Sequence, residues 1–157
     1  MEKFDVSVIL PIKSSKANGF AEYFEKAITS LKNQTKKINE LIIVHTDETS
    51  LVEFLGSFDF GDLKVNKIVW TKDPNFSEQV NYGVRSSESK WVSLFEFDDE
   101  YSNIWFKNVE KYSIAHPEVD AFLPIVIDTD EKGQFAGFTN EATFALNIAA
   151  EMGILSN

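Results

Sequence analysis

The chain has 157 residues, of which 43% are hydrophobic and 25% charged, so it is long and apolar enough for one ordinary globular domain with a core. It contains no cysteine, which excludes disulfides and thiolate metal sites and fits the cytoplasmic location that we expect. The net charge of −10 disfavours nucleic-acid partners, and no apolar run approaches the roughly 20 residues that span a bilayer.

The first half of the chain alternates short apolar runs with amphipathic segments. Val6–Ile12 is rich in β-branched residues and predicts a buried strand, and the polar stretch after it predicts a loop in which Asn18 caps the next helix. Apolar residues recur at helical spacing over Phe20–Asn33. Further strands are predicted at Leu41–Val44 and Val65–Trp70, with a short helix over Ser50–Leu55 between them.

The second half continues this alternation and ends in a hairpin and a helix. Asn75 and Glu78 have the spacing of a capping box, which predicts a helix to about Ser87 and then a strand at Trp91–Phe95. Ser102 is expected to cap the next helix, which ends before Pro117. The remaining predicted elements are a strand at Ala121–Ile127, a hairpin return at Gln134–Phe138, and a helix at Glu141–Met152 capped by Asn140.

This order of elements predicts an α/β fold. Strands that alternate with helices form a mostly parallel, Rossmann-like sheet with helices on its faces, here followed by a C-terminal β-hairpin and helix. In such sheets ligands bind beyond the carboxyl ends of the strands. Polar segments follow three of the predicted strands, namely Lys13–Ser15, His45–Glu48 and Glu96–Glu100. We therefore expect the functional site at the sheet edge that these segments share.

The acidic turn Glu96-Phe97-Asp98-Asp99-Glu100 has two interpretations. Its carboxylates follow a strand and offer the oxygen ligands that Mg²⁺ prefers, together with phosphate oxygens of a diphosphate. A metal bound there would stabilise the charge of a leaving phosphate as a Lewis acid. The other interpretation is a solvated loop that caps the following helix, because acidic residues are common before helix N-termini.

Two further residues have a functional and a structural interpretation. His45 either contacts a base or phosphate or belongs to the polar surface, and Arg85 either pairs with a diphosphate or is a surface charge on an amphipathic helix. The chain has no P-loop, no Gly-x-Gly-x-x-Gly and no Ser-His-Asp arrangement, which weakens the ATPase, dehydrogenase and hydrolase classes.

Taken in chain order, several segments resemble the N-terminal, nucleotide-sugar-binding part of family 2 glycosyltransferases, which have the GT-A fold. Asn81-Tyr82-Gly83 matches the Asn-x-Gly of the helix before the metal strand, and Trp91–Asp99 resembles that strand and its acidic turn. The other matching segments are the opening strand Val6–Pro11, the helix end Ala27–Thr35, the second strand Glu40–Val44 and the helix end His116–Asp120. No single segment is specific, but their order and spacing are, and together they cover nearly the whole chain.

The resemblance implies a metal-dependent glycosyltransferase, or its donor-binding domain, that transfers a sugar from a nucleotide-sugar. Mg²⁺ or Mn²⁺ would hold the diphosphate of the donor, with Asp98 and Asp99 as the best ligands and Glu96 in the place of the first acid. The nucleotide-sugar-binding residues expected from the resemblance and from the chemistry above are Pro11, Ile12, Lys13, Thr46, Asp47, Asn81, Arg85 and Asp98.

Two departures from the family pattern leave an alternative open. His45 and Thr46 stand where the family usually has an Asp-Asp pair that hydrogen-bonds the base, and Asp47 could substitute only if the loop shifts. The family's general base lies beyond the hairpin, about where this chain reaches Asn157, so no catalytic residue is identified. We expect either a C-terminally truncated part of a longer glycosyltransferase or a catalytically inactive GT-A-like module with a structural or protein-interaction role. The acceptor, and membership of a homo-oligomer or larger assembly, stay open.

Overall fold

The structure, a computed structural model, describes residues 3–73, 75–130 and 132–139. Contacts between residues group the chain into two compact units: residues 1–115, called the first unit below, and residues 116–157, called the second unit. The single domain expected over residues 1–157 stays a prediction. Among the described residues, no helix combines the length and the hydrophobicity that crossing a membrane requires.

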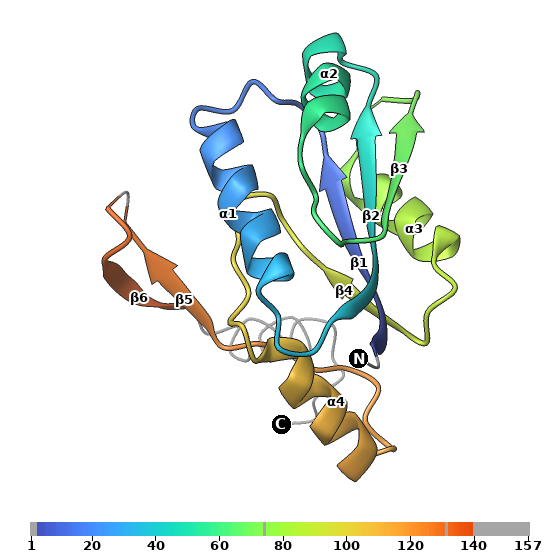
Figure 1. The fold of residues 1–157 in the computed structure, drawn as a ribbon, viewed down its shortest axis with the longest axis vertical. Coiled ribbons are helices and arrows are strands. Elements are labelled where there is room, and N and C mark those ends of the chain that lie inside the picture. Colours follow the sequence, from blue (N-terminus) through green and yellow to red (C-terminus); the bar gives the residue numbers. More distant parts are fainter. Residues whose placement is uncertain (1–2, 74, 131, 140–157) are drawn as a thin grey trace, which may run out of the picture. The chain divides into compact units, whose positions relative to one another are not determined.

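Four parallel strands form the sheet of the first unit (Figure 1). They are β1 (Phe4–Ile12), β2 (Ile38–Thr46), β3 (Val65–Trp70) and β4 (Trp91–Leu94), in the order β3-β2-β1-β4. β1 pairs with β2 on one side and β4 on the other, and its Ile9 lies opposite Ile42 of β2 and Leu94 of β4. The parallel sheet predicted from the sequence is thereby confirmed.

Helices cover both faces of this sheet (Figure 1). α1 (Phe20–Lys32) connects β1 to β2, and α2 (Thr49–Ser57) connects β2 to β3. Both connections move in the same direction across the sheet, so right-handed crossovers put both helices on one face. α3 (Phe76–Ser86) leads back past β1 to β4 and so covers the opposite face. α4 (Trp105–Ala115) packs on the start of β1, with the ring centroids of Phe106 and Phe4 6.5 Å apart.

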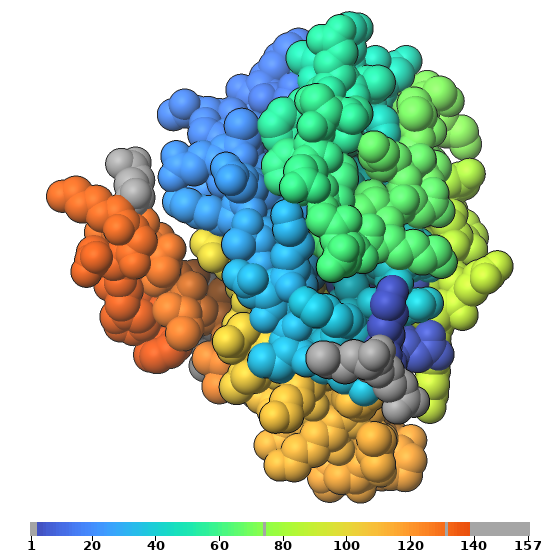
Figure 2. All heavy atoms as spheres, viewed as in Figure 1, coloured from blue at the N-terminus to red at the C-terminus, as the bar shows by residue number. Residues whose placement is uncertain are grey.

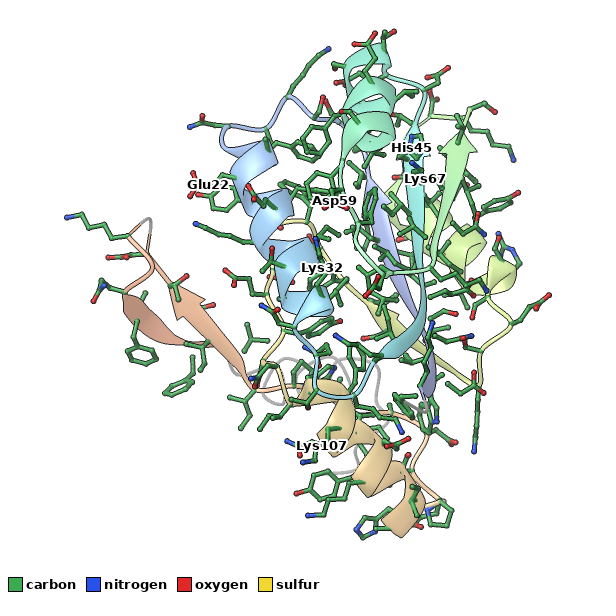
Figure 3. All side chains as sticks on the ribbon, in the orientation of Figure 1. Glu22, Lys32, His45, Asp59, Lys67 and Lys107 are labelled. Carbon is green, nitrogen blue, oxygen red and sulfur yellow. The ribbon has the colours of Figure 1, made fainter. Side chains whose placement is uncertain are left out.

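Different side chains form the core on the two faces. Phenylalanine rings join α1 to α2, with Phe24 fully buried and its ring centroid 5.3 Å from that of Phe54. The space-filling view shows these two helices closing over one face of the sheet (Figure 2). At the end of α1, Nζ of Lys32 donates to the carbonyl oxygen of Asp59 at 3.2 Å, which joins that helix to the segment after α2 (Figure 3). Under α3 the core consists of Ile9, Ile42, Val44 and Trp70, with Ile68 and Val84 against them.

Three local predictions in the first unit are wrong. Ser102 does not cap α4, because that helix begins only at Trp105, whose amide donates to the backbone carbonyl oxygen of Ser102. Asn18 does not cap α1, because Gly19 occupies the N-cap position with a φ of 74° and no side chain hydrogen-bonds the first turn. The second strand is longer than Leu41–Val44, because polar residues at both ends of β2 are buried and satisfied. Glu40 accepts the hydroxyl of Ser7 at 2.9 Å, and Thr46 donates to the carbonyl oxygen of Lys13 at 2.9 Å.

The described part of the second unit contains an antiparallel hairpin of β5 (Val126–Thr129) and β6 (Phe135–Thr139). The predicted hairpin is confirmed, with Ile127 opposite Phe138. The predicted strand from Ala121 is wrong in its first half, because Pro124 lacks the N–H that a ladder needs and regular pairing begins only at Val126. The helix predicted at Glu141–Met152 and its cap Asn140 lie outside the described residues.

Candidate functional site

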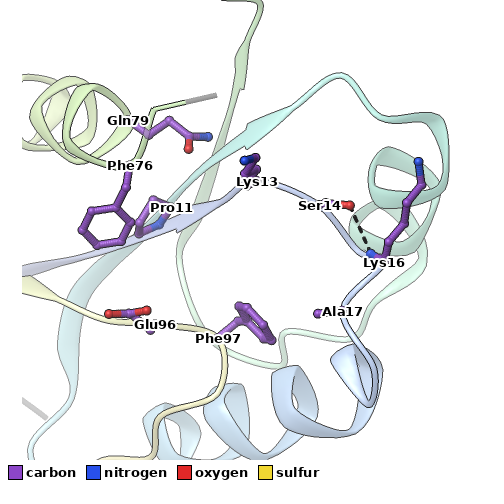
Figure 4. A pocket seen from close by; sticks show the side chains of 9 residues that line it. All are labelled: Pro11, Lys13, Ser14, Lys16, Ala17, Phe76, Gln79, Glu96 and Phe97. Atoms are coloured by element: carbon purple, nitrogen blue, oxygen red, sulfur yellow. Dashed lines mark hydrogen bonds between the residues drawn. The ribbon is translucent and has the colours of Figure 1, made fainter. Parts of the chain in front are cut away.

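A pocket of about 370 Å³ opens in the first unit at the carboxyl edge of the sheet (Figure 4). Three segments line it: the end of β1 with the loop after it, the start of α3, and the acidic turn after β4. The lining residues are Pro11, Lys13, Ser14, Lys16, Ala17, Phe76, Gln79, Glu96 and Phe97. The strand order reverses between these two strands, because the chain runs from β1 outward to β2 and β3 and then returns to the other side of β1 as β4; such a switch point is where open α/β sheets bind ligands.

Pro11 explains why the sheet opens at this point. The amide of Phe95 donates to the carbonyl oxygen of Ile9 at 3.0 Å, so the backbone polar groups of Ile9 face β4. Successive residues of a strand direct their backbone groups to alternate sides, so Pro11, two residues after Ile9, also directs its groups toward β4. At that level β4 has already ended, at Leu94. Proline has no N–H to donate, and β4 can separate from β1 here without leaving a donor unpaired.

The loop after β1 is held by hydrogen bonds on its outer side. The hydroxyl of Ser14 accepts from the amide of Lys16 at 3.1 Å, which tightens the loop between two pocket-lining lysines (Figure 4). The same hydroxyl donates to the carboxylate of Glu48 at 2.6 Å. Glu48 also accepts the hydroxyls of Ser15 at 2.7 Å and Ser50 at 2.6 Å. Lys13 and Lys16 therefore belong to a loop that the start of α2 holds in place.

α3 supplies a buried amide at the base of the pocket. Asn75 caps this helix by accepting the amide of Glu78 at 3.2 Å, which confirms the cap predicted from the sequence. Gln79 is 1% exposed, and its Nε2 donates to the carbonyl oxygens of Ile12 and Val44, both at 3.3 Å. One side chain thus connects the carboxyl ends of β1 and β2.

The acidic turn contributes a carboxylate and an aromatic ring to the pocket. The amide of Asp99 donates to the carbonyl oxygen of Glu96 at 3.3 Å, which closes the turn. The ring of Phe97 lies against Phe20 of α1, with centroids 5.0 Å apart, and so fixes the turn to that helix. Partial burial raises the pKa of the Glu96 carboxyl, and the charges of Asp99 and Asp98 raise it further.

The structure gathers some of the predicted site residues and separates others. Pro11, Lys13 and Glu96 line the pocket, and Asp98 and Asp99 belong to the same turn as Glu96. The other predicted residues do not line it: Ile12 and Thr46 are buried, whereas Asp47, Asn81 and Arg85 are exposed. Whether any of them binds a nucleotide-sugar stays a prediction.

His45 does not belong to a surface loop, as one sequence interpretation had it. β2 continues through it, and its side chain is 3% exposed (Figure 3). Its Nδ1–H donates to the carbonyl oxygen of Thr46 at 2.8 Å, so this edge of the ring is already satisfied within the protein.

Sequence reasoning missed several pocket residues, among them Gln79, Phe97 and Lys16. For Gln79 a signal was present, because it lies four residues before Gly83 and helical periodicity puts both on one face of α3. For Phe97 the pattern carried no signal, since its direction follows from the contact with Phe20, which is distant in sequence.

Solved structures that resemble this chain include that of TarS of S. aureus. Its residues 1-349 superpose with a TM-score of 0.54 at 18% identity, over 74% of this chain and 33% of TarS 1-349. The same residues of TarS in complex with UDP-GlcNAc give a TM-score of 0.53 at 20% identity, over 74% of this chain and 32% of that one. At these identities the likeness shows the fold, which is the GT-A fold expected from the sequence.

Two sequence comparisons relate the chain to known proteins, and the second identifies its family. The minor teichoic acid biosynthesis protein GgaB of Bacillus subtilis (strain 168) is 29% identical in an alignment of 137 residues that covers 83% of this chain but only 15% of GgaB. The chain thus spans a small part of the length of this relative, and about a third of TarS 1-349. The sequence profile of glycosyl transferase family 2 matches residues 7–151, so the chain belongs to that family.

Proposed function

We propose that the first unit binds the nucleotide-sugar donor of a metal-dependent glycosyltransferase. The observation that carries this proposal is the pocket between β1 and β4, which joins the lysines of the β1 loop to the acidic turn in a chain of glycosyl transferase family 2. The complex of TarS with UDP-GlcNAc supports a nucleotide-sugar as the ligand class, since TarS shares the fold.

Charge gives each side of the pocket a separate part in donor binding. Lys13 and Lys16 supply ammonium groups, which attract the oxygens of a diphosphate as point charges. Glu96, on the facing segment, supplies a carboxylate that would repel the same oxygens unless a cation lay between them. A divalent metal would therefore let both sides of the pocket act on one diphosphate.

The acidic turn suits such a cation. Repulsion from Asp99 and Asp98 contributes to the raised pKa of Glu96, and a bound cation would relieve that repulsion. Asp98 and Asp99 are the proposed ligands, with Glu96 beside them, and Mg²⁺ or Mn²⁺ would act as a Lewis acid on the diphosphate. Among the described residues, no group of three or more His, Cys, Asp and Glu side chains is arranged to hold a metal alone. Phosphate oxygens of the donor would complete the ligand set, so metal and nucleotide should bind together.

Calorimetry tests this coupling directly. Titrating UDP-GlcNAc and a panel of other nucleotide-sugars into the protein should give binding with Mn²⁺ or Mg²⁺ present and little or none with EDTA. The double variant Asp98→Asn/Asp99→Asn should lose the metal-dependent part. Asp62→Asn is the matched control, because this exposed aspartate lies in the first unit away from the pocket lining. If no nucleotide-sugar binds in a metal-dependent way, the proposal is wrong.

A second function, that of an inactive module for protein interaction, is favoured by the hairpin of the second unit. Ile127 and Phe138 face each other across its strands and are 57% and 64% exposed. Exposed apolar pairs of this kind occur at interaction surfaces. Sedimentation of the wild type and of Ile127→Ser/Phe138→Ser distinguishes the two functions. Self-association that this variant abolishes, in a protein that binds no nucleotide-sugar, would support the module.

A further inference from the structure

One carboxylate joins the pocket loop to the start of α2. Glu48 precedes α2, and its Oε2 accepts the hydroxyl of Ser14 at 2.6 Å while its Oε1 accepts those of Ser15 at 2.7 Å and Ser50 at 2.6 Å. Hydrogen bonds from hydroxyls to a charged carboxylate are short and about twice as strong as those between neutral groups. Two of the three donors belong to the loop after β1, and the third belongs to α2 itself.

The side chain of Glu48 binds this loop and accepts no backbone amide of its own helix. An acidic residue at an N-cap position usually accepts a backbone amide of the first helical turn. Glu48 is the N-cap of α2, yet its side chain makes no such bond. Its carboxylate is bonded to hydroxyls on a segment more than thirty residues earlier in the chain.

The same three hydroxyls favour the charged form of Glu48. The hydroxyls of Ser14, Ser50 and Ser15 lower the pKa of Glu48 to about 2. The lowered pKa keeps the carboxylate ionised on mild acidification, so the loop does not lose its acceptor there. Thr46 adds a second attachment, because its Oγ1 donates to the carbonyl oxygen of Lys13 at 2.9 Å.

The held segment is the part of the pocket that carries positive charge. Lys13, Ser14, Lys16 and Ala17 all line the pocket, and the hydroxyl that Glu48 binds also accepts the amide of Lys16. Moving Ser14 would therefore move the backbone from which Lys16 extends (Figure 4).

We propose that Glu48 is a positioning residue, whose carboxylate orders the loop Lys13–Lys16 and so fixes the wall that this loop presents to the anionic part of the ligand. This role rests on the proposed donor binding, but the ordering of the loop is measurable without any ligand. Of the two acidic residues that follow β2, Glu48 is then the one that contributes to ligand binding. It does so by ordering the loop, because its oxygens already accept protein hydroxyls.

The first test is amide hydrogen exchange of the ligand-free protein. In Glu48→Ala, amides of residues 14–17 should exchange about tenfold faster or more, because the two charge-assisted bonds to this loop are lost. Glu53→Ala, an exposed change on the same helix, should leave them at the wild-type rate. Ser14→Ala/Ser15→Ala approaches the same bonds from the other side. If it speeds exchange to a similar extent and adding Glu48→Ala to it has little further effect, the two sides act through one interaction.

The second test is affinity for UDP-GlcNAc with Mn²⁺, measured by calorimetry. Glu48→Ala should weaken binding about tenfold, and Glu53→Ala should not. Unchanged exchange at residues 14–17 in Glu48→Ala would overturn the ordering role. Faster exchange with unchanged affinity would overturn the contribution of the ordered loop to binding. A wild type that binds no nucleotide-sugar would refute the proposed function, and the exchange result would then decide the ordering role on its own.

Discussion

A Cβ atom on Gly83 would lie 2.5 Å from Cγ2 of Ile9 and 3.2 Å from Cγ2 of Val44. α3 therefore lies as close to β1 and β2 as the backbone allows, and a hydrogen in place of a side chain is what permits it. The same approach lets Gln79, one helical turn earlier, reach the carbonyl oxygens of Ile12 and Val44. The Asn-x-Gly segment of α3 thus has a packing role that sequence comparison alone did not reveal.

Gly83→Ala should destabilise the protein by about 1–3 kcal/mol, because the added methyl group overpacks a core of fully buried side chains. Gly56→Ala is the matched control, since Gly56 lies in α2 and a Cβ atom added there would meet nothing within 4 Å. That change should be neutral or stabilising by up to about 1 kcal/mol, because alanine is the better helix former. Urea unfolding followed by circular dichroism measures both, and equal effects would contradict the packing role.

Gln79→Leu should cost about 1–3 kcal/mol, because two carbonyl oxygens at the sheet edge lose their buried donor. Leucine branches one carbon earlier than glutamine, so Gln79→Met, which keeps the unbranched length, shows how much of the loss comes from packing and how much from the hydrogen bonds. Gln134→Leu, at an exposed position of the hairpin, is the control and should change the free energy of unfolding little. A stability of Gln79→Leu equal to that of the wild type would show that these bonds contribute nothing net.

The strands were predictable where their signal is local. Val65–Trp70 coincides with β3, and the apolar run of Val6–Ile12 lies within β1, because β-branched residues in a short run favour a strand wherever they pack. The extent of β2 was not predictable. Its polar ends, Glu40 and Thr46, become strand residues only because partners more than thirty residues away satisfy them.

Asn75 caps α3, whereas Asn18, also predicted as a helix cap, does not cap α1. Asn75→Ala should destabilise by about 1 kcal/mol, since its side chain accepts the amide of Glu78. Asn18→Ala should have an effect near zero, because Gly19 occupies the cap position of α1. Thermal unfolding of the two variants makes the comparison. A larger loss for Asn18→Ala would restore the cap predicted from the sequence.

The site was predictable to a similar, partial extent. Positions directly after a strand, such as Lys13 and Glu96, reach the pocket because the carboxyl ends of parallel strands share one edge. Between the adjacent acids Asp47 and Glu48, sequence spacing favoured Asp47, whereas the serine hydroxyls engage Glu48. Which of the two acids is engaged depends on the contact between the loop after β1 and the start of α2. These segments are distant in sequence, so no short-range pattern predicts the contact.

Glu96 gives the acidic turn a pH dependence with a definite sign. Burial and the charges of Asp99 and Asp98 raise its pKa above that of an unfolded glutamate, so the folded protein holds this proton more tightly than the unfolded chain. Stability is then lost as the pH rises through the range between the two pKa values. Below the ordinary glutamate pKa of about 4.3, Glu96 is protonated in both states and this loss disappears.

Glu96→Gln should therefore be more stable than the wild type at pH 7 in EDTA, and the advantage should vanish when unfolding is measured below about pH 4. The direction follows from removing a charge that its two acidic neighbours disfavour. With Mn²⁺ and UDP-GlcNAc present at pH 7 the order should reverse, because a bound cation turns the carboxylate from a repelled group into a stabilised one. Urea titrations in EDTA and with the metal and nucleotide test the two halves separately. An advantage of Glu96→Gln that persists at low pH would contradict the raised pKa, whereas an order unchanged by metal and nucleotide would contradict the metal site alone.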